Sequence, residues 1–380
     1  MEHSDTASIV SLGASLKGKQ KKLWKKVEDD VLGDDPNYVI TITPKHKKNG
    51  ERDLFMLYCD GQAVGRAAIV VDARWVREKN ENTGFIDDFV IHPNHVDLSD
   101  MLIEHCLYIL KQKGVDSVIV RHGGFPALAA QEFHDLAPAS LPCNPPWYIE
   151  LFERNGFVKH KEWGNFRLSI PTQCSAADIA KWESILACHH SNAQPLDVKN
   201  WNQVKQYSNL TYEVLVDHYG YIPTRFMDSH SIIHFVGFGI LCKITRLKVY
   251  VIQDSSGKIV GFLSYHPDYN VIKKSLRKYS KMKWYNPQTF LAISSFISSI
   301  RTNKRAAIGS IGFAKESRKK GFIKAIDYGV QFLIKEGYEQ LDSGPVLIEN
   351  AVVVKMIERF SKRYDVDMKR TCYYTLMHTF

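Results

Sequence analysis

The apolar and polar positions of the C-terminal half of the chain predict a series of strands and helices. Residues 306–313 form an apolar run bounded by basic and polar residues, which predicts a buried strand. The basic stretch 317–324 follows, and apolar residues then recur at helical spacing over 325–335. Residues 341–347 predict another strand, and the apolar stripe within 353–360 predicts another helix. This half is therefore expected to run strand, basic turn, helix, strand, helix.

The N-terminal half repeats this order in outline. Apolar runs within 54–71 flank a turn dipeptide at 60–61 and predict a hairpin. A strand is predicted at 85–91, a helix at 98–113 and a further strand at 115–120. Because 380 residues are many for one core, two domains are expected.

The basic stretch has the composition of an anion-binding turn. Free backbone N–H groups and the positive end of the helix dipole favour phosphate at the start of a helix. Arg318, Lys319 and Lys320 add Coulombic attraction, and Gly321 lets a phosphate approach the backbone closely. A basic helix start is by itself more often a solvated surface, so the residues around it decide the interpretation.

Residues 306–376 resemble the acyl-CoA-dependent acyltransferases of the GNAT superfamily, whose pyrophosphate loop reads Arg/Gln-x-x-Gly-x-Gly/Ala between a strand and a helix. Arg318 and Gly321 match this pattern, whereas Ile323 stands where Gly or Ala is usual. In that family the strand before the loop offers backbone N–H groups to the thioester carbonyl, and an asparagine precedes the last helix. The resemblance implies the following cofactor-binding residues: Ile311, Phe313, Arg318, Lys319, Lys320, Gly321, Phe322, Ile323 and Asn350.

The first half carries a degenerate form of the same pattern. Residues 85–93 resemble the strand and turn, and 148–157 resemble the GNAT ending Leu-Tyr-Glu-x-x-Gly-Phe. The chain thus resembles a tandem GNAT protein of mixed α/β (α+β) class, in which each domain has a mixed, mostly antiparallel sheet flanked by helices. We expect an N-terminal domain at 1–170, a linker and first helix at 171–200, and a C-terminal domain with the acyl-CoA loop at 201–380.

The turn after the first-half strand differs from the basic turn of the second half. Residues 94–100 hold no glycine, lysine or arginine, and Asp97 and Asp100 lie near the helix start. Such carboxylates cap a helix but repel a pyrophosphate. We therefore expect the N-terminal domain to have lost this cofactor site and to keep a structural or acceptor-shaping role. Asp87 and Asp88 precede the turn, and strand alternation predicts that only one of them points inward.

Three further segments resemble a bacterial subfamily that includes the bacterial ceramide synthases. They are the Asn-Pro-Pro-Trp-Tyr stretch at 144–148, the His-Tyr-Gly-Tyr-Ile-Pro stretch at 218–223 and the segment 261–270, which begins Gly-Phe and contains Pro-Asp-Tyr-Asn. Three segments in the same order are more specific than the loop alone. They point to the subfamily more than to the substrate.

Candidate catalytic residues follow from the place of each segment. A hairpin predicted at 248–265 ends close to Asp268, our first choice for an acceptor-side carboxylate, with a helix cap as the alternative. His218 and Tyr219 fall where GNAT proteins cover the acceptor site, and there they can orient or deprotonate an amine. Packed aromatic residues on a loop are the equal alternative. Ser310, on the predicted strand, is a candidate proton donor.

The proton donor is an open question because of two substitutions. Many GNAT enzymes place a tyrosine just after the asparagine to protonate the leaving thiol, and the resemblance places Ile357 and Phe152 at this position in the two halves. Neither residue has a hydroxyl. Either Ser310 or a water then supplies the proton, or proton donation does not limit the reaction.

Composition bounds the partners and the setting. The net charge of +9 indicates an anionic partner, which can be cofactor phosphate, nucleic acid or an acidic membrane surface. The seven cysteines form no Cys-x-x-Cys pair, so neither a zinc site nor a disulfide framework is indicated, and no metal is expected. Reduced thiols and the polar N-terminus favour a cytoplasmic protein. The lysine-rich stretch 17–26, with Leu23 and Trp24 inserted, predicts a solvated helix face, with a peripheral membrane contact as the alternative.

Three functions are compatible with these observations. The first is an N-acyltransferase that moves an acyl group from acyl-CoA, or from an acyl-carrier protein, to an amine acceptor. The apolar stretch 231–242 makes a long-chain acyl group and a lipid-like amine one form of it. The second is a tandem-GNAT aminoacyl transferase that uses charged tRNA, which the pyrophosphate loop disfavours. The third is a non-catalytic acyl-CoA-binding protein. No DNA partner is expected.

Overall fold

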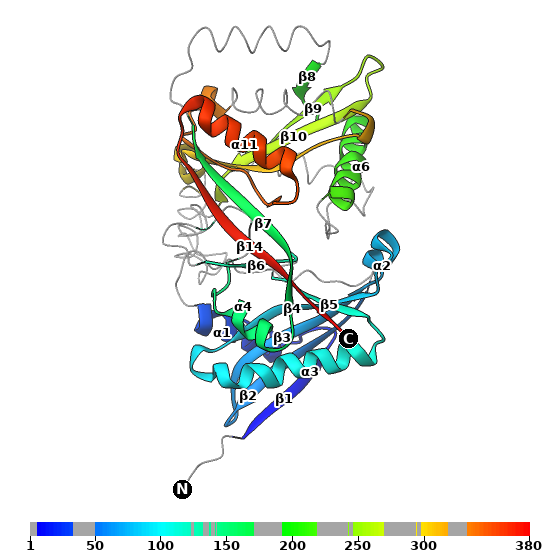
Figure 1. Cartoon of the computed structure of the whole chain (residues 1–380), viewed down its shortest axis with the longest axis vertical. Coiled ribbons are helices and arrows are strands. Elements are labelled where there is room, and N and C mark those ends of the chain that lie inside the picture. Colours follow the sequence, from blue (N-terminus) through cyan, green and yellow to red (C-terminus); the bar gives the residue numbers. More distant parts are fainter. Residues whose placement is uncertain are drawn as a thin grey trace. The chain divides into compact units, whose positions relative to one another are not determined.

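The computed structural model describes residues 6–32, 50–122, 125–131, 137, 141, 143–170, 192–218, 242, 246–269, 294, 298–317 and 333–380. The chain divides into two compact units. Unit 1 holds Met1–Asp135, Pro142–Trp163 and Cys372–Phe380, and unit 2 holds Leu136–Leu141 and Gly164–Thr371. Figure 1 shows a mixed sheet flanked by helices in each unit, which confirms the predicted mixed α/β class.

The sheet of unit 1 runs in the order β1-β2-β3-β4-β5-β14. Only β4 and β5 pair in parallel, while the other neighbours are antiparallel. The predicted hairpin and strands are confirmed as β2, β3, β4 and β5. The strands are β1 (Ala7–Gly13), β2 (Gly50–Cys59), β3 (Gln62–Asp72), β4 (Thr83–Ile91), β5 (Ser117–Val120), β6 (Leu128–Ala129), β7 (Val158–Ser169) and β14 (Met368–Thr379). The helices are α1 (Lys19–Leu32), α2 (Ala73–Lys79), the 3₁₀-helix η1 (Pro93–Leu98), α3 (Ser99–Gln112) and α4 (Tyr148–Arg154).

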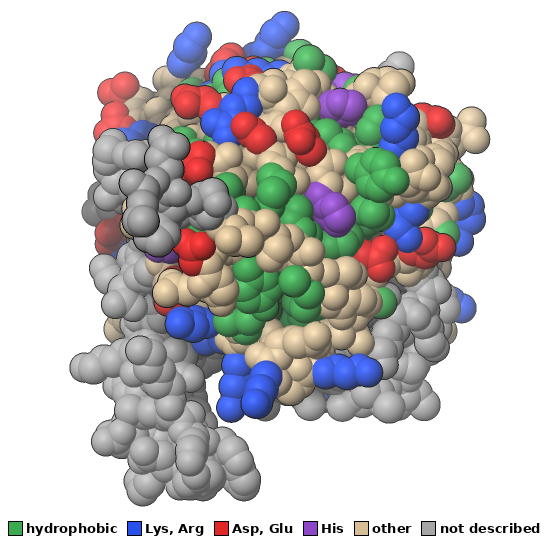
Figure 2. All heavy atoms as spheres, turned by 90° about the horizontal axis from the view of Figure 1, so that it is seen from below, with side chains coloured by type: hydrophobic (Ala, Val, Ile, Leu, Met, Phe, Trp, Pro, Cys, Tyr) green, Lys and Arg blue, Asp and Glu red, His purple; other side chains and the backbone are tan. Residues whose placement is uncertain are grey.

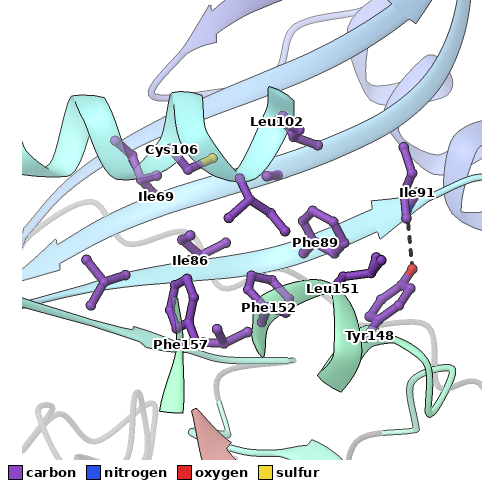
Figure 3. Packing of buried hydrophobic residues seen from close by; sticks show 14 of the residues in the cluster. Ile69, Ile86, Phe89, Ile91, Leu102, Cys106, Tyr148, Leu151, Phe152 and Phe157 are labelled. Carbon is purple, nitrogen blue, oxygen red and sulfur yellow. Dashed lines mark hydrogen bonds between the residues drawn. The ribbon is translucent and has the colours of Figure 1, made fainter. Parts of the chain in front are cut away.

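The core of unit 1 lies between the sheet and helices α3 and α4 (Figure 3). Leu102, Cys106 and Leu110 recur every four residues on α3 and are fully buried, as the helical periodicity predicts. The ring of Phe89 on β4 packs edge-on against Phe152 of α4 at 5.0 Å. Such aromatic pairs stabilise by about 0.5–1.5 kcal/mol beyond the area they bury. Phe152 is therefore a core residue of unit 1.

The sheet of unit 2 runs in the order β7-β12-β11-β10-β9-β8. The pair β11–β12 is parallel, and the other pairs with a defined register are antiparallel. The predicted strand at 306–313 is confirmed as β11, and the predicted hairpin is confirmed as β9–β10. The strands are β8 (Asn192–Pro195), β9 (Lys248–Gln253), β10 (Ile259–Pro267), β11 (Arg305–Phe313), β12 (Gln340–Asp342) and β13 (Val346–Leu347). The helices are α6 (Trp201–His218), the 3₁₀-helix η2 (Lys315–Ser317) and α11 (Ala351–Tyr364).

The strand predicted over 341–347 is two strands, β12 and β13, so this prediction is wrong in its extent. Gly344 between them has φ +71°, a left-handed conformation that a continuous strand does not contain. At Ser343 the backbone N–H still donates to the Phe166 carbonyl, but the Phe166 N–H donates to the Ser343 hydroxyl, both at 2.9 Å. The turn therefore divides the segment 341–347, whose apolar composition predicted one continuous strand.

Each sheet contains a strand that comes from a distant part of the sequence. In unit 1, Met377 of β14 pairs with Ile119 of β5, and Trp163 Nε1 donates to Thr375 Oγ1 at 2.9 Å. In unit 2, Leu168 of β7 pairs with Leu341 of β12. Each unit therefore contains a pair of hydrogen-bonded strands that lie far apart in the sequence.

Helix α1 turns its tryptophan inward. Trp24 is 4% exposed and lies under the Arg66 guanidinium, which is 4.8 Å from the ring centroid. The alternative in which Trp24 inserts into a membrane interface is therefore wrong. The favoured interpretation of a solvated helix face is confirmed, because the helix lysines are exposed: Lys19, Lys21, Lys22, Lys25 and Lys26.

Among the residues that the structure describes, no helix has both the length and the apolar composition needed to cross a bilayer.

Candidate functional site

Strand β11 carries a bulge in its middle. Ser264 of β10 pairs with Ser310, but the next residue, Tyr265, pairs with Ile308, so Gly309 has no partner in the ladder. Bulges re-aim side chains and are common beside active sites. The parallel pairing with β12 covers only Arg305 to Ala307. Beyond it, β11 pairs with β10 and with no other strand in the described part of the chain.

The bulge brings the backbone of β11 so close to β10 that a side chain at Gly309 does not fit without a shift of its neighbours. A β-carbon at Gly309 would lie 2.9 Å from Ser264 Oγ and 3.4 Å from His266 Cδ2. Gly309 is exposed, whereas Ser264 and His266 are buried. The Ser264 and Ser310 hydroxyls are 2.8 Å apart and share a hydrogen bond. The exposed backbone at Gly309 therefore lies close to the Ser264 hydroxyl and the His266 ring.

Helix α6 adds a third hydroxyl to this group. Burial raises the pKa of Tyr207, while side-chain hydrogen bonds with Ser310, Thr211 and Ser264 act in the opposite direction. The Tyr207 ring packs edge-on against Phe262 of β10 at 5.4 Å. Sequence reasoning did not single out Tyr207. The available signal was its helical spacing with Thr211, one turn later on the same face of α6.

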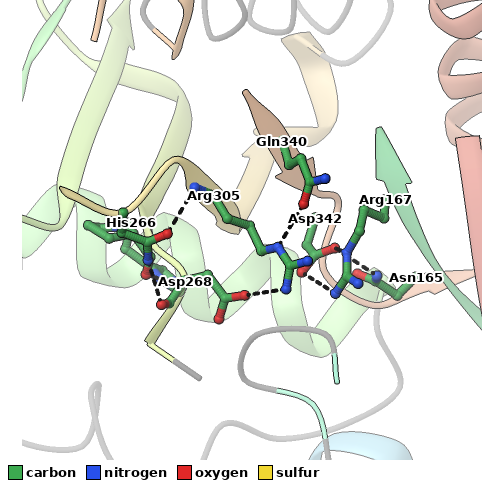
Figure 4. A network of polar contacts seen from close by, with 9 residues as sticks. Asn165, Arg167, His266, Asp268, Arg305, Gln340 and Asp342 are labelled. Atoms are coloured by element: carbon green, nitrogen blue, oxygen red, sulfur yellow. Dashed lines mark hydrogen bonds and ion pairs between the residues drawn. The ribbon is translucent and has the colours of Figure 1, made fainter. Parts of the chain in front are cut away.

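A network of charged residues holds the ends of β10 and β11 together (Figure 4). The Asp268 side chain is fully buried, and its Oδ2 lies 3.4 Å from Arg305 Nη1. Arg305 Nε also donates to Gln340 Oε1 on β12 at 3.0 Å. The backbone adds two bonds, since Asp268 N–H donates to the Arg305 carbonyl and Asn303 Nδ2 donates to the Asp268 carbonyl, both at 2.8 Å. The carboxylate predicted to face the acceptor is therefore engaged with an arginine.

A second ion pair of this network joins β7 to β12. Arg167 Nε donates to Asp342 Oδ1 at 2.8 Å, and its Nη2 donates to Oδ2 at 3.2 Å. Asp342 is completely buried, and Asn165 Nδ2 donates to the same carboxylate at 3.4 Å. A bidentate pair of this kind fixes geometry as well as charge. These contacts therefore hold β7 and β12 together, and β12 is the strand next to the bulged strand β11.

The predicted cofactor residues are only partly within the described residues. Ile311 and Phe313 lie on β11 opposite Leu263 and Gly261, with Phe313 buried and Ile311 half-buried. Asn350 precedes α11 and makes no capping hydrogen bond with its side chain. Arg318, Lys319, Lys320, Gly321, Phe322 and Ile323 lie outside the described residues.

The predicted catalytic residues separate in the same way. Asp268 directly follows β10, and Ser310 lies on the neighbouring strand β11, where it belongs to the cluster of hydroxyls described above. The backbone of His218 ends α6, and Tyr219 lies outside the described residues. The structure therefore brings together Ser310, Ser264, Tyr207 and His266. The last three carried no role in the sequence analysis.

Strand β4 of unit 1 corresponds to β11 of unit 2, since each is paired in parallel with the next strand of its unit. Strand β4 also carries a bulge. Arg66 pairs with Val90 and Ala68 pairs with Asp87, which leaves two residues of β4 opposite one of β3. Asp88 there has φ +52°. Asp87 and Asp88 are both buried, with exposures of 5% and 2%, as is every residue of β4, so the expectation that only one of them points inward stays a prediction. The bulge breaks the alternation on which the prediction rested.

Arginines neutralise both carboxylates of this second bulge. Asp87 Oδ2 lies 3.2 Å from Arg121 Nη2, and Asp88 Oδ2 accepts from Arg52 Nη2 at 3.0 Å. Arg121 in turn stacks over the ring of Phe85 at 4.0 Å. The bulge of unit 1 is thus closed by ion pairs.

Within the residues that the structure describes, no group of three or more His, Cys, Asp or Glu side chains is arranged to hold a metal ion.

Two solved structures show the class of fold. The GCN5-related glucosamine N-acetyltransferase region of a fungal multi-domain GH3 β-N-acetylglucosaminidase is 11% identical, with TM-score 0.53, over 99% of this chain and 38% of that one. A tandem GNAT protein from the clavulanic acid biosynthesis pathway is 9% identical, with TM-score 0.50, over 98% of each chain. The chain therefore has the fold of the GCN5-related N-acetyltransferases, and at such low identity the likeness concerns the fold alone.

The chain spans 38% of the length of the fungal protein and nearly all of the tandem one. No protein-family model matches the sequence, and no curated protein matches it. The likeness to a ceramide synthase-like subfamily stays a prediction.

Proposed function

We propose that the protein is an N-acyltransferase whose reaction takes place at the β11 bulge of unit 2. The observation that carries this proposal is the exposed backbone of the β11 bulge at Gly309, which lies close to the Ser264 hydroxyl and the His266 ring. A reacting carbonyl needs polar groups that can stabilise developing charge. The bulge places such groups beside exposed backbone, on a strand that leads directly into the basic stretch 317–324.

The donor in this proposal is an acyl thioester of coenzyme A. The sequence Arg-Lys-Lys-Gly at 318–321 supports it, because cations and a glycine at a helix start suit a diphosphate. Ile311 and Phe313 belong to the half of β11 beyond its pairing with β12, where backbone N–H groups can meet the thioester carbonyl. An acyl-carrier protein is the alternative donor, since it presents the same phosphopantetheine thioester.

The acceptor in this proposal is a primary amine. Its nitrogen attacks the thioester carbonyl carbon, the carbon–sulfur bond breaks, and an amide and a thiol result. Ser310 passes a proton to the leaving thiolate and regains one from the attacking amine, which loses a proton as the amide forms, and the Ser264 and Tyr207 hydroxyls hold Ser310 in position. Ile357 cannot take this part, because it packs in a core cluster with Phe166 and lacks a hydroxyl.

A long-chain acyl group and a lipid-like amine remain one form of the proposal. The face drawn in Figure 2 intersperses acidic and basic side chains, with exposed hydrophobic side chains between them. That face is not a continuous cationic surface of the kind that binds anionic lipids. The cytoplasm is the proposed setting, and the cysteines described as free thiols suit it: Cys59, Cys106, Cys143, Cys242 and Cys372.

The test combines donor binding with turnover. Isothermal titration with coenzyme A measures donor binding, and thiol release from acetyl-, butyryl- and palmitoyl-CoA is then followed with a panel of primary amines. Replacing Arg318, Lys319 and Lys320 together by alanine should weaken binding of coenzyme A on the order of 10-fold or more. The matched control removes three exposed lysines of α1, Lys21, Lys22 and Lys25, and should leave binding unchanged.

Two outcomes would overturn the proposal. If coenzyme A does not bind and aminoacyl-tRNA is consumed with an amine acceptor, the protein is an aminoacyl transferase. If coenzyme A binds and no amine in the panel accelerates thiol release from any donor, the protein is a non-catalytic acyl-CoA-binding protein.

A further inference from the structure

We propose that a surface cavity of unit 1 binds the ammonium group of a primary alkylamine. The cavity has a volume of about 420 Å³, which is within the range of small-molecule sites. The proposed acyl transfer gives this cavity no part, and the inference does not depend on that reaction. The residues of its lining that matter here come from the start of α4, the start of β7 and the middle of β14: Pro146, Trp147, Glu150, Glu153, Lys159 and Tyr374.

One wall of the cavity is the Asn-Pro-Pro-Trp-Tyr stretch, to which the proposed function assigns no role. Its two ends are buried and fixed. Asn144 Oδ1 accepts from the Ala129 N–H at 2.6 Å, and the Tyr148 hydroxyl accepts from the Ile91 N–H at 3.2 Å, the bond drawn in Figure 3. Between these anchors Trp147 is half-buried and lines the cavity. The stretch therefore holds an indole at a defined place in the wall.

An ammonium group of the chain itself shows how this lining holds a cation. Lys159 Nζ lies 4.5 Å from the centroid of the Tyr374 ring and 3.6 Å from Glu153 Oε1. The face of an aromatic ring and a carboxylate both attract positive charge. The Lys159 side chain is 51% exposed, so a ligand can displace it without disturbing the core.

A second aromatic residue and a second carboxylate line the same cavity without a cation of their own. Trp147 and Glu150 are three residues apart at the start of α4, a spacing that places two side chains on one side of a helix. The Glu150 carboxylate is exposed and makes no ion pair or hydrogen bond with any described residue. Tryptophan is the aromatic residue that attracts cations most strongly. An incoming ammonium group therefore meets an indole and a carboxylate that no lysine or arginine neutralises.

The charge of the lining decides the class of ligand. Two carboxylates and one ammonium leave the cavity with a net negative charge, although the whole chain carries +9. Phosphates and carboxylates are therefore repelled. A primary ammonium has three N–H donors for the two carboxylates, which a quaternary ammonium lacks. The apolar part of the lining, which includes Pro146, suits a short alkyl chain.

The experiment measures binding to the whole chain and uses no turnover assay. The probe is n-butylammonium, and 1-butanol is the neutral compound of the same size. Saturation-transfer NMR titrations at low salt give the affinity for each, and thermal unfolding checks the fold of each variant. Lys159→Met removes the internal ammonium, Glu150→Gln removes the unpaired carboxylate, and Trp147→Leu removes the indole. Lys22→Met, at an exposed lysine of α1, is the matched control for the loss of a charge.

If the cavity is an ammonium site, butylammonium binds and butanol does not. The affinity for butylammonium rises about 2- to 5-fold in Lys159→Met, because the Tyr374 ring and the Glu153 carboxylate become available. It falls about 2- to 5-fold in Glu150→Gln and in Trp147→Leu, and Lys22→Met leaves it unchanged. If Trp147→Leu does not fold, the two substitutions of exposed residues decide the question.

Three outcomes would overturn the inference: no binding of butylammonium, equal binding of butanol, or an affinity that Lys159→Met and Glu150→Gln leave unchanged. The last would mean that the amine binds at another place in the chain. None of them bears on the proposed acyl transfer, which turnover of an acyl thioester tests separately.

Discussion

The bulged strands β4 and β11 have the same place in the two sheets and opposite contents. In β4 the bulge holds two aspartates, each paired with an arginine and excluded from solvent. In β11 the bulge holds Gly309, which is exposed beside two serines and a histidine. A carboxylate–arginine pair neutralises its own charge, whereas the glycine leaves the backbone exposed and the hydroxyls keep hydrogen-bonding capacity. The backbone irregularity is common to both, and the side chains decide whether it is a structural joint or a candidate reaction site.

The largest expected effect comes from opening the closed bulge. Replacing Asp87 by alanine leaves Arg121 buried beside Phe85 without its carboxylate, and breaking such a pair costs about 3–5 kcal/mol of stability. Urea unfolding followed by circular dichroism measures the change, with the exposed Asp97→Ala as control. Coenzyme A affinity of the folded protein should not change. A loss of unfolding free energy no greater than in the control would show that the ion pairs are not what holds this bulge.

The next effect comes from adding a side chain at Gly309, in the bulge of β11. Gly309→Val places a side chain against Ser264 Oγ and His266 Cδ2, where the carbonyl and the amine are proposed to meet. We expect kcat/KM to fall on the order of 100-fold, about 2.7 kcal/mol, because a displaced reactant loses its alignment. Steady-state kinetics measures this, and Ser255→Val, in the exposed turn between β9 and β10, is the control. Undiminished turnover would place the reaction elsewhere.

A third effect is a pH dependence of stability that comes from His122 in unit 1. Burial lowers the pKa of His122 in unit 1; Asp87 and Glu28 oppose the shift and Arg66 adds to it. A histidine whose pKa is lower in the folded than in the unfolded protein makes its whole contribution to the free energy of unfolding at pH values above its unfolded pKa. That contribution is lost as the pH falls from the unfolded pKa, about 6.5, toward the folded value. The loss amounts to about 1.4 kcal/mol for each unit of the difference.

The measurement is the unfolding midpoint of the wild type and of His122→Asn between pH 8 and pH 5. The substitution should flatten the decline below pH 6.5, because one proton uptake on unfolding is removed. Parallel curves for the two proteins would contradict the assignment.

The smallest effect concerns Tyr207. Tyr207→Phe keeps the ring against Phe262 and removes the hydroxyl that hydrogen-bonds with Ser310 and Ser264. A neutral hydrogen bond contributes about 0.5–1.5 kcal/mol, so kcat should fall about 2- to 10-fold. Kinetics of this variant beside Tyr108→Phe, at a largely exposed tyrosine, measures it. An unchanged kcat would remove Tyr207 from the site.

The sequence predicted the elements better than their local breaks. Periodicity located β11, the β9–β10 hairpin and α3, because burial on one face imposes a pattern on the side chains. It did not locate the bulges at Asp88 and Gly309. A bulge depends on how two strands align, and a single strand carries no information about its partner's register.

The candidate site was predictable in part for the same reason. Asp268 was named from its place at the end of a predicted strand, and Ser310 because the residues at the usual tyrosine positions lack a hydroxyl. His266 lies two residues from Asp268 and was given no role, since its place beside Gly309 depends on a strand register that the sequence does not specify. Tyr207 comes from a helix that lies about a hundred residues earlier than Ser310, and only the tertiary packing of α6 on β10 and β11 brings the two together.

The strand that unit 1 takes from the far end of the sequence has a consequence for synthesis on the ribosome. Thr375 Oγ1 donates to the Pro126 carbonyl across 249 residues of chain, and Met377 pairs with Ile119. Until these late residues emerge, the outer edge of β5 has no strand beside it, and exposed strand edges invite association with other chains. Unit 1 therefore reaches its final form only after the residues of unit 2 have been translated, and a fragment cut before residue 372 should be prone to aggregate.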